Sequence, residues 1–267
     1  MEIGDRCKTW TVGGRVAGFV HACHAANYAN GAFREYLLAD ADLVMRLPDH
    51  LSFAEASTLG MGVSTAAQAL YQWLPLPLPT CDPTMSDQNI LIYGGSTATG
   101  SIAIQLAKLS GLRVITTCSQ QHISWLRSLG ADEVIDYRDL SATETIRSLP
   151  ESLIYAGLMA STEEPPRPEF LPASTHIHSV WNIVYTCFGR RFTMNKEEMG
   201  LKRTSEASNV DKNFMVTFYW RVEQFLQNKL LRPMPIEIRK GGLAGVLEGV
   251  SEVRKGAVRG KKLVYEL

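Results

Sequence analysis

Short apolar runs and amphipathic segments alternate through the middle of the chain. The predicted strands are residues 89–93, 113–118 and 133–137, and the predicted helices between them are residues 101–110 and 123–129. Apolar side chains in the helical segments recur at a helical period, and Gly111 and Gly130 follow these segments as typical helix-ending residues. This order of elements predicts a βαβαβ unit, and therefore an α/β protein with a parallel sheet.

The flanking regions carry weaker patterns. We expect strands at residues 14–21, 32–38, 43–48, 180–188 and 262–267, and helices at residues 52–58, 64–73, 212–230 and 243–254. Ser52 and Glu55 have the spacing of a capping box, which favours a helix start at this point. Proline is frequent in residues 74–87 and 161–172, which predicts loops there.

A turn of small residues, Gly-Gly-Ser-Thr-Ala-Thr-Gly at 94–100, joins the first of the central strands to its helix. A helix start offers unpaired N–H groups and a favourable dipole to an anion, and small side chains let a ligand approach the backbone. Gly94 and Gly100 fit the glycine pattern of dinucleotide-binding turns, whereas Thr97 replaces the middle glycine. The turn predicts a Rossmann-like, doubly wound sheet that binds a dinucleotide; a tight turn without a ligand is the alternative.

The residues after the second central strand bear on the choice of cofactor. An NAD site places an acid there to bind the ribose 2′-hydroxyl, but residues 118–122 contain none, and the next acid is Asp132. Ser119, Gln120 and His122 are able to donate hydrogen bonds to a 2′-phosphate instead. The segment therefore favours NADP over NAD, with an ordinary helix N-cap at Ser119 as the alternative.

Composition and charge narrow the class of protein. The chain has 267 residues, 27 basic and 27 acidic, so we expect no binding to nucleic acid or to a membrane surface. No apolar run reaches the length of a membrane span, and the first residues lack the apolar core of a signal peptide, which predicts a cytoplasmic protein. The five cysteines are scattered, and His21, Cys23 and His24 lack a fourth ligand, so neither disulfides nor a metal site is expected.

Four motifs occur in an order that is typical of one family. They are Gly-Arg-Val-Ala-Gly-Phe at 14–19, Gly-Ala-Phe-Arg-Glu-Tyr at 31–36, Leu-Gly-Met-Gly-Val-Ser-Thr-Ala at 59–66 and Tyr-Gly-Gly-Ser-Thr-Ala-Thr-Gly at 93–100. With them the chain resembles the zinc-independent medium-chain dehydrogenase/reductase superfamily, and within it the trans-acting enoyl reductases of fungal polyketide biosynthesis. The resemblance implies an NADP-binding Rossmann domain at residues 67–199 and a truncated GroES-like, β-rich substrate domain at residues 1–66 and 200–267.

The same resemblance implies an activity. It is the NADPH-dependent reduction of an α,β-unsaturated thioester on the acyl carrier domain of a polyketide synthase, or of a hybrid of polyketide synthase and nonribosomal peptide synthetase (PKS-NRPS). Hydride would reach the β-carbon of the enoyl substrate, and the resulting enolate would take a proton at its α-carbon. The enzyme's contribution would be positioning and stabilisation of the oxyanion. The resemblance leaves the catalytic residues unknown and implies no zinc.

Site residues carry over from the family by position. The implied cofactor contacts are Ser96, Thr97, Ala98, Thr99, Ser119, Gln120, Gln121, His122, Tyr137, Val258 and Arg259. The implied substrate-lining residues are Leu59, Gly60, Met61, Gly62, Val63, Ser64, Thr65, Tyr185, Thr186, Cys187, Phe188 and Gly189. The first set surrounds the predicted dinucleotide turn, and the second is expected beside the nicotinamide.

Two departures from the family pattern leave alternatives open. Family chains begin with a longer N-terminal part of the substrate domain, and after residue 149 they continue through further strand and helix units. This chain instead passes into a proline-rich stretch, so we expect a Rossmann sheet that is abbreviated after residue 150. The alternatives are a quinone or alkenal reductase of the same superfamily, a non-catalytic relative that binds NADPH or the synthase, and a Rossmann-like domain of unrelated activity.

Overall fold

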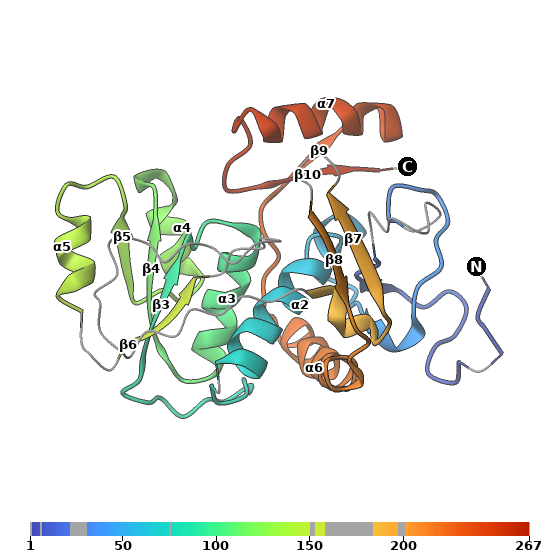
Figure 1. Cartoon of the computed structure of the whole chain (residues 1–267), viewed down its shortest axis with the longest axis horizontal. Coiled ribbons are helices and arrows are strands. Elements are labelled where there is room, and N and C mark those ends of the chain that lie inside the picture. The colour runs from blue at the N-terminus through green and yellow to red at the C-terminus, as the bar shows by residue number, and fades with distance from the viewer. Residues whose placement is uncertain are drawn as a thin grey trace.

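A parallel four-stranded sheet forms one end of the molecule (Figure 1). The computed structural model describes residues 2–5, 7–21, 31–74, 76–149, 153–157, 184–196 and 201–266. The strands of the sheet are β3 (Asn89–Tyr93), β4 (Arg113–Cys118), β5 (Glu133–Asp136) and β6 (Leu153–Gly157). Their order is β5-β4-β3-β6, with every neighbouring pair parallel. The predicted βαβαβ unit is confirmed, and β6 is a fourth strand that the sequence analysis did not predict.

Both faces of this sheet are buried. The helices that follow its strands are α3 (Ala98–Leu109), α4 (Ile123–Ser128) and α5 (Ala142–Arg147). Alternate residues of β3 enter two separate cores: Ile90 and Ile92 share one with α3, whereas Leu91 shares the other with Ala142 and Ile146 of α5. Burial on both faces is typical of a doubly wound sheet, so the Rossmann-like fold class is confirmed.

Two antiparallel strand pairs and a group of short helices lie on the other side of α3. The pairs are β1 (Val16–Gly18) with β2 (Val44–Arg46), and β7 (Phe192–Lys196) with β8 (Leu201–Ser205). The helices are η1 (Ala41–Leu43), α1 (Phe53–Ala56), α2 (Gly60–Ala67), its π-helical continuation η2 (Gln68–Trp73), and η4 (Val184–Phe188). The predicted capping box begins α1: Ser52 Oγ accepts from Glu55 N–H, and the Glu55 carboxylate accepts from Ser52 N–H.

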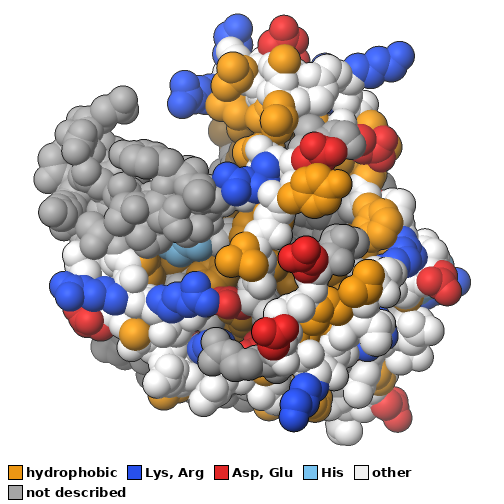
Figure 2. Space-filling model, turned by 90° about the vertical axis from the view of Figure 1, so that its right-hand side faces the viewer, with side chains coloured by type: hydrophobic (Ala, Val, Ile, Leu, Met, Phe, Trp, Pro, Cys, Tyr) orange, Lys and Arg blue, Asp and Glu red, His pale blue; other side chains and the backbone are white. Residues whose placement is uncertain are grey.

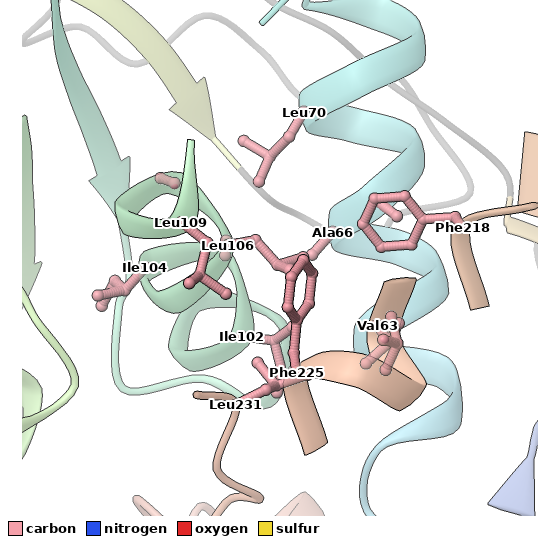
Figure 3. Packing of buried hydrophobic residues seen from close by; sticks show 14 of the residues in the cluster. Val63, Ala66, Leu70, Ile102, Ile104, Leu106, Leu109, Phe218, Phe225 and Leu231 are labelled. Carbon is pink, nitrogen blue, oxygen red and sulfur yellow. The ribbon is translucent and has the colours of Figure 1, made fainter. Parts of the chain in front are cut away.

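One long helix, α6 (Asn209–Gln227), joins these elements into a continuous core. Figure 3 shows Phe218 and Phe225 of α6 pointing toward side chains of α2 and α3. Phe225 is only 1% exposed and shares its cluster with Val63 of α2 and Leu106 of α3. The predicted boundaries at residues 66 and 200 stay a prediction, and this core crosses both of them.

The C-terminal unit is β9 (Ile236–Arg239), α7 (Gly242–Arg254) and β10 (Lys262–Tyr265), in which β9 and β10 form a parallel pair. Its side chains are much more exposed than those of the four-stranded sheet: Leu247 is 76% and Val253 is 56% exposed. Figure 2 shows apolar side chains on this face of the molecule, with basic and acidic side chains among them and along the upper edge. The unit therefore contributes little buried apolar surface.

Some sequence predictions are wrong. Residues 32–38 form no strand; they are bends and open chain, with Phe33 and Leu38 exposed. Of the strand predicted at 180–188, residues 184–188 are the 3₁₀-helix η4, and the earlier part lies outside the described residues. A strand requires a partner for its backbone groups, and no described strand pairs with either segment. Among the described residues, no helix is long and apolar enough to cross a membrane.

Candidate functional site

The turn between β3 and α3 needs glycine because atoms of the protein already fill the space that a side chain would occupy. A Cβ atom on Gly95 would lie 2.2 Å from Thr116 Oγ1, and one on Gly100 would lie 2.4 Å from the Gly94 carbonyl oxygen. Gly94 has a φ of +78°, a conformation that side chains disfavour. The turn is tied to β4 by hydrogen bonds from Gly94 N–H to Thr117 Oγ1 (3.0 Å) and from Gly95 N–H to Thr117 O (2.9 Å).

The structure also explains why threonine replaces the middle glycine of the pattern. Thr97 has an extended backbone with φ −77°, so the position does not need glycine. Its Oγ1 caps α3 by accepting from Gly100 N–H at 3.0 Å. In the described part of the chain, no acceptor meets the N–H groups of Ala98 and Thr99, which begin α3. These groups and the helix dipole favour an anionic ligand.

The loop after β4 lies against the loop before β10. Gly260 has a φ of +65°, and a Cβ atom on it would lie 2.3 Å from the His122 ring. The burial of His122 in this contact lowers the pKa of its imidazole. Ser119 is buried, and its side chain makes no capping hydrogen bond to the short helix η3 (Gln120–His122), contrary to the alternative of an ordinary N-cap.

A cavity of about 420 Å³ lies where these segments meet. It is lined by Ser96, Thr97, Ala98, Ser119, His122, Tyr137, Met234, Val258, Arg259, Gly260, Lys261 and Lys262. The structure thus brings together eight of the eleven residues expected to contact a cofactor, from four separate parts of the chain.

The other three expected cofactor residues do not line this cavity. Thr99 lies one position further into α3. Gln120 donates its N–H to Asp136 Oδ2 at 3.1 Å, and the Gln121 side chain contacts His122 Nε2 at 3.1 Å. Asp136 is an acid close to the loop after β4, but it ends β5 and does not line the cavity.

The charges at the cavity are all of one sign. Arg259, Lys261 and Lys262 line it, and no carboxylate does. Sequence reasoning missed Met234, Gly260 and the two lysines. The lysines precede an apolar closing strand, and only their position after a glycine in a basic segment, Arg-Gly-Lys-Lys at 259–262, gives a sequence signal. Because opposite charges attract strongly at a partly buried site, this wall favours a phosphate-bearing ligand.

The expected substrate residues at 59–65 mostly belong to the core. Apart from Met61, they are buried, and Ser64 Oγ lies 2.7 Å from Tyr219 OH of α6. A Cβ atom on Gly62 would lie 3.3 Å from the Ala98 carbonyl oxygen, so α2 packs directly against the start of α3. Of these seven residues, Met61 is the one that lines a second cavity, which has a volume of about 340 Å³ and lies beside β1. This segment therefore lies next to the cofactor turn, but no described cavity exposes all of it.

The expected substrate residues at 185–189 form an aromatic group with β1 and β7. Tyr185 and Phe188 contact Phe19, with ring centroids 5.7 and 4.8 Å apart. Thr186 accepts from the Gln68 side chain at 3.1 Å, and Gly189 has a φ of +61°. Cys187 is fully buried, and burial raises the pKa of its thiol to about 12, so it is a packing residue and not a nucleophile. Their role toward a substrate stays a prediction.

The 94–100 turn and its surroundings fit a nicotinamide dinucleotide. The glycines allow a tight turn at the start of α3, the first N–H groups of this helix are free, and the cavity beside them is lined by cationic side chains. For a metal, the described residues contain no group of three or more His, Cys, Asp or Glu side chains with ligand geometry. His21 is described, but Cys23 and His24 lie outside the described residues.

Solved structures are similar to this chain in fold. A quinone oxidoreductase of Pseudomonas syringae superposes with a TM-score of 0.65 at 18% identity, covering 98% of this chain and 78% of the other. The JamJ enoyl reductase in its apo form gives a TM-score of 0.57 at 17% identity, covering 85% of this chain and 67% of the other. At such identities the likeness shows the fold alone.

Sequence comparison is more specific. A family model described as zinc-binding dehydrogenase matches residues 98–158. The trans-enoyl reductase caaB of Aspergillus niger is 37% identical over 95% of this chain and 76% of its own length. The trans-enoyl reductase TOXD of Cochliobolus carbonum is 42% identical over 72% of this chain and 70% of its own. The chain, which spans about three quarters of these relatives, therefore belongs to the trans-enoyl reductase family of the medium-chain dehydrogenase/reductase superfamily.

Proposed function

We propose that this protein is an NADPH-dependent enoyl reductase that reduces an α,β-unsaturated thioester on the acyl carrier domain of a polyketide synthase or PKS-NRPS hybrid. The observation on which the proposal rests is the cavity at the 94–100 turn, which is lined by the start of α3 and by Arg259, Lys261 and Lys262, and by no carboxylate. Membership of the trans-enoyl reductase family supports the reaction class.

The preference for NADPH follows from the side of the cavity formed by Ser119, His122 and Arg259. An NAD site needs an acid that accepts from the ribose 2′-hydroxyl, and no acid lines this cavity. Arg259 is exposed, and its Nε donates only to the Gly256 carbonyl at 3.0 Å, so its terminal nitrogens are available to a 2′-phosphate. Ser119 and His122 would add hydrogen bonds from the opposite loop.

The chemistry divides between cofactor and protein. Bound NADPH would supply the hydride that reaches the β-carbon of the enoyl thioester. The 94–100 turn would fix the position of the dinucleotide. Because Gly62 packs on the Ala98 carbonyl, residues 59–65 at the start of α2 would stay at a constant distance from the dinucleotide. We assign no catalytic acid.

Two measurements test this function, first nucleotide binding and then turnover. We expect the purified protein to bind NADPH more tightly than NADH in a fluorescence titration, and then to oxidise NADPH in the presence of a short enoyl thioester. A free quinone is the matched substrate control. Turnover of the quinone alone would favour the alternative reductase activity, binding without any turnover would favour a non-catalytic partner of the synthase, and binding of neither nucleotide would overturn the proposal.

A further inference from the structure

The two lysines at the cavity differ in their partners. Lys261 is exposed, and its ammonium pairs with the Glu237 carboxylate. Lys262 is half-buried, and no carboxylate of the described residues pairs with it; its Nζ donates to the Thr58 carbonyl oxygen at 3.1 Å. This burial without a counter-charge lowers the pKa of Lys262. An ammonium in such a place is stabilised when an anion reaches it.

The position of Lys262 shows which part of a dinucleotide it would meet. Thr58 lies two residues before α2, and Gly62 in the first turn of α2 packs against the Ala98 carbonyl oxygen. The Lys262 ammonium is therefore held on the side of the cavity that contains the start of α3. His122, which packs on Gly260, marks the side formed by the loop after β4.

We propose that Lys262 binds the diphosphate of the dinucleotide together with the free N–H group of Ala98, which lines the same cavity. This inference rests on the proposed function and deepens it, because it assigns a charged ligand to the diphosphate, whereas the Gly-rich turn offers only backbone groups. One ammonium proton stays on Thr58, which leaves two for phosphate oxygens. The same side chain thus links the cofactor to the segment that precedes α2.

The diphosphate is common to NADH and NADPH, which makes the proposal testable by binding alone. In fluorescence titrations, Lys262→Met should raise the Kd for both nucleotides by about tenfold or more, because a charge-assisted hydrogen bond is lost, and should leave the ratio of the two Kd values nearly unchanged. Lys255→Met is the matched control and should change either Kd by less than about threefold, because Lys255 is exposed, does not line the cavity and is screened by solvent. Arg259→Met should raise the Kd for NADPH alone.

A second measurement uses the unaltered protein, in case Lys262→Met fails to fold. Lysine acetylation followed by mass spectrometry should show Lys262 protected by either nucleotide, while the exposed Lys255 stays reactive. A Lys262→Met effect confined to NADPH, an effect no larger than that of Lys255→Met, or labelling of Lys262 that saturating NADH leaves unchanged would each overturn the inference. If the wild-type protein binds neither nucleotide, the proposed function itself fails, and that outcome is distinct from the other three.

Discussion

The four-stranded sheet and the C-terminal unit of β9, α7 and β10 are built in opposite ways. Ile90, Leu91 and Ile92 of β3 are each 0% exposed, because helices cover both faces of their sheet. The C-terminal unit has two strands and one helix, and Leu247 on α7 is 76% exposed. Yet β10 of this weakly buried unit begins with Lys262, which lines the same cavity as residues 96–98 of the turn. The four-stranded sheet therefore supplies the rigid buried framework beside the cavity, and the C-terminal unit supplies its positive charges.

The largest expected difference between the two regions is in stability. Leu106→Ala in α3 should lower the free energy of unfolding by about 2–5 kcal/mol, because Leu106 is fully buried and its removal leaves a cavity. The same substitution at the exposed Leu247 in α7 should change it by less than about 0.5 kcal/mol. Urea unfolding of both variants measures the difference. Similar losses for the two would show that α7 packs against more than the described contacts.

The loop between α7 and β10, which contacts His122 after β4, offers a second matched pair. Gly260→Ala should raise the Kd for NADPH by about tenfold, because its Cβ would displace the His122 ring and overpacked sites rearrange. Gly256→Ala has a similar positive φ, but its nearest contact is Arg259 at 3.8 Å. Both variants should lose about 1–2 kcal/mol of stability from backbone strain. An equal rise in Kd for the two would mean that strain, and not the His122 contact, governs binding.

A smaller loss of stability is expected from a substitution in the contact between α6 and residues 59–65. Tyr219→Phe removes the hydroxyl that lies 2.7 Å from Ser64 Oγ, while Ser64 keeps its own hydrogen bond to the Gly60 carbonyl. We expect a loss of about 1 kcal/mol, the usual net value of one buried hydrogen bond. Thermal unfolding compared with Tyr265→Phe, on the half-buried β10, measures it. A loss above about 3 kcal/mol would contradict this assignment, because it would require α2 to depend on the contact.

The smallest effect concerns pH. The pKa of His122 is lower in the folded protein than the unfolded value of 6.5, because burial disfavours the charged ring. The unfolded chain therefore binds more protons below about pH 6.5, and the stability that neutral His122 contributes is present above that pH and lost below it. Without cofactor, the free energy of unfolding should fall more steeply in wild type than in His122→Gln as the pH drops from about 7.5 to 5.5. Parallel pH profiles would contradict the burial of this ring.

The sequence predicts the central fold well because local pattern and tertiary burial agree there. Residues 90–92 and 114–115 are short apolar runs inside the segments 89–93 and 113–118, and the observed strands have the bounds of these two segments. β6 escaped prediction because its five residues follow Pro150 and precede a proline-rich stretch, so only its pairing with β3 identifies it. The strand predicted at 32–38 had the loose alternation of a strand but no described partner strand.

The sequence predicts those residues of the candidate site that belong to a local motif. Ser96, Thr97 and Ala98 belong to a turn whose chemistry is visible in seven consecutive residues. Lys262 has no such signal, because Thr58, whose carbonyl oxygen accepts from the Lys262 ammonium, lies 204 positions earlier in the chain. A contact over that separation depends on the folding of the whole molecule and not on any local pattern.

The central claim is that a dinucleotide binds where the four-stranded sheet meets the C-terminal unit. Hydrogen–deuterium exchange with and without NADPH tests it most directly, because it reports on each segment separately. The account predicts slower exchange on NADPH binding in two places at once, the 94–100 turn and the 256–262 segment, with α5 unchanged. Protection of only one of these segments, or of neither while NADPH is bound, would contradict it.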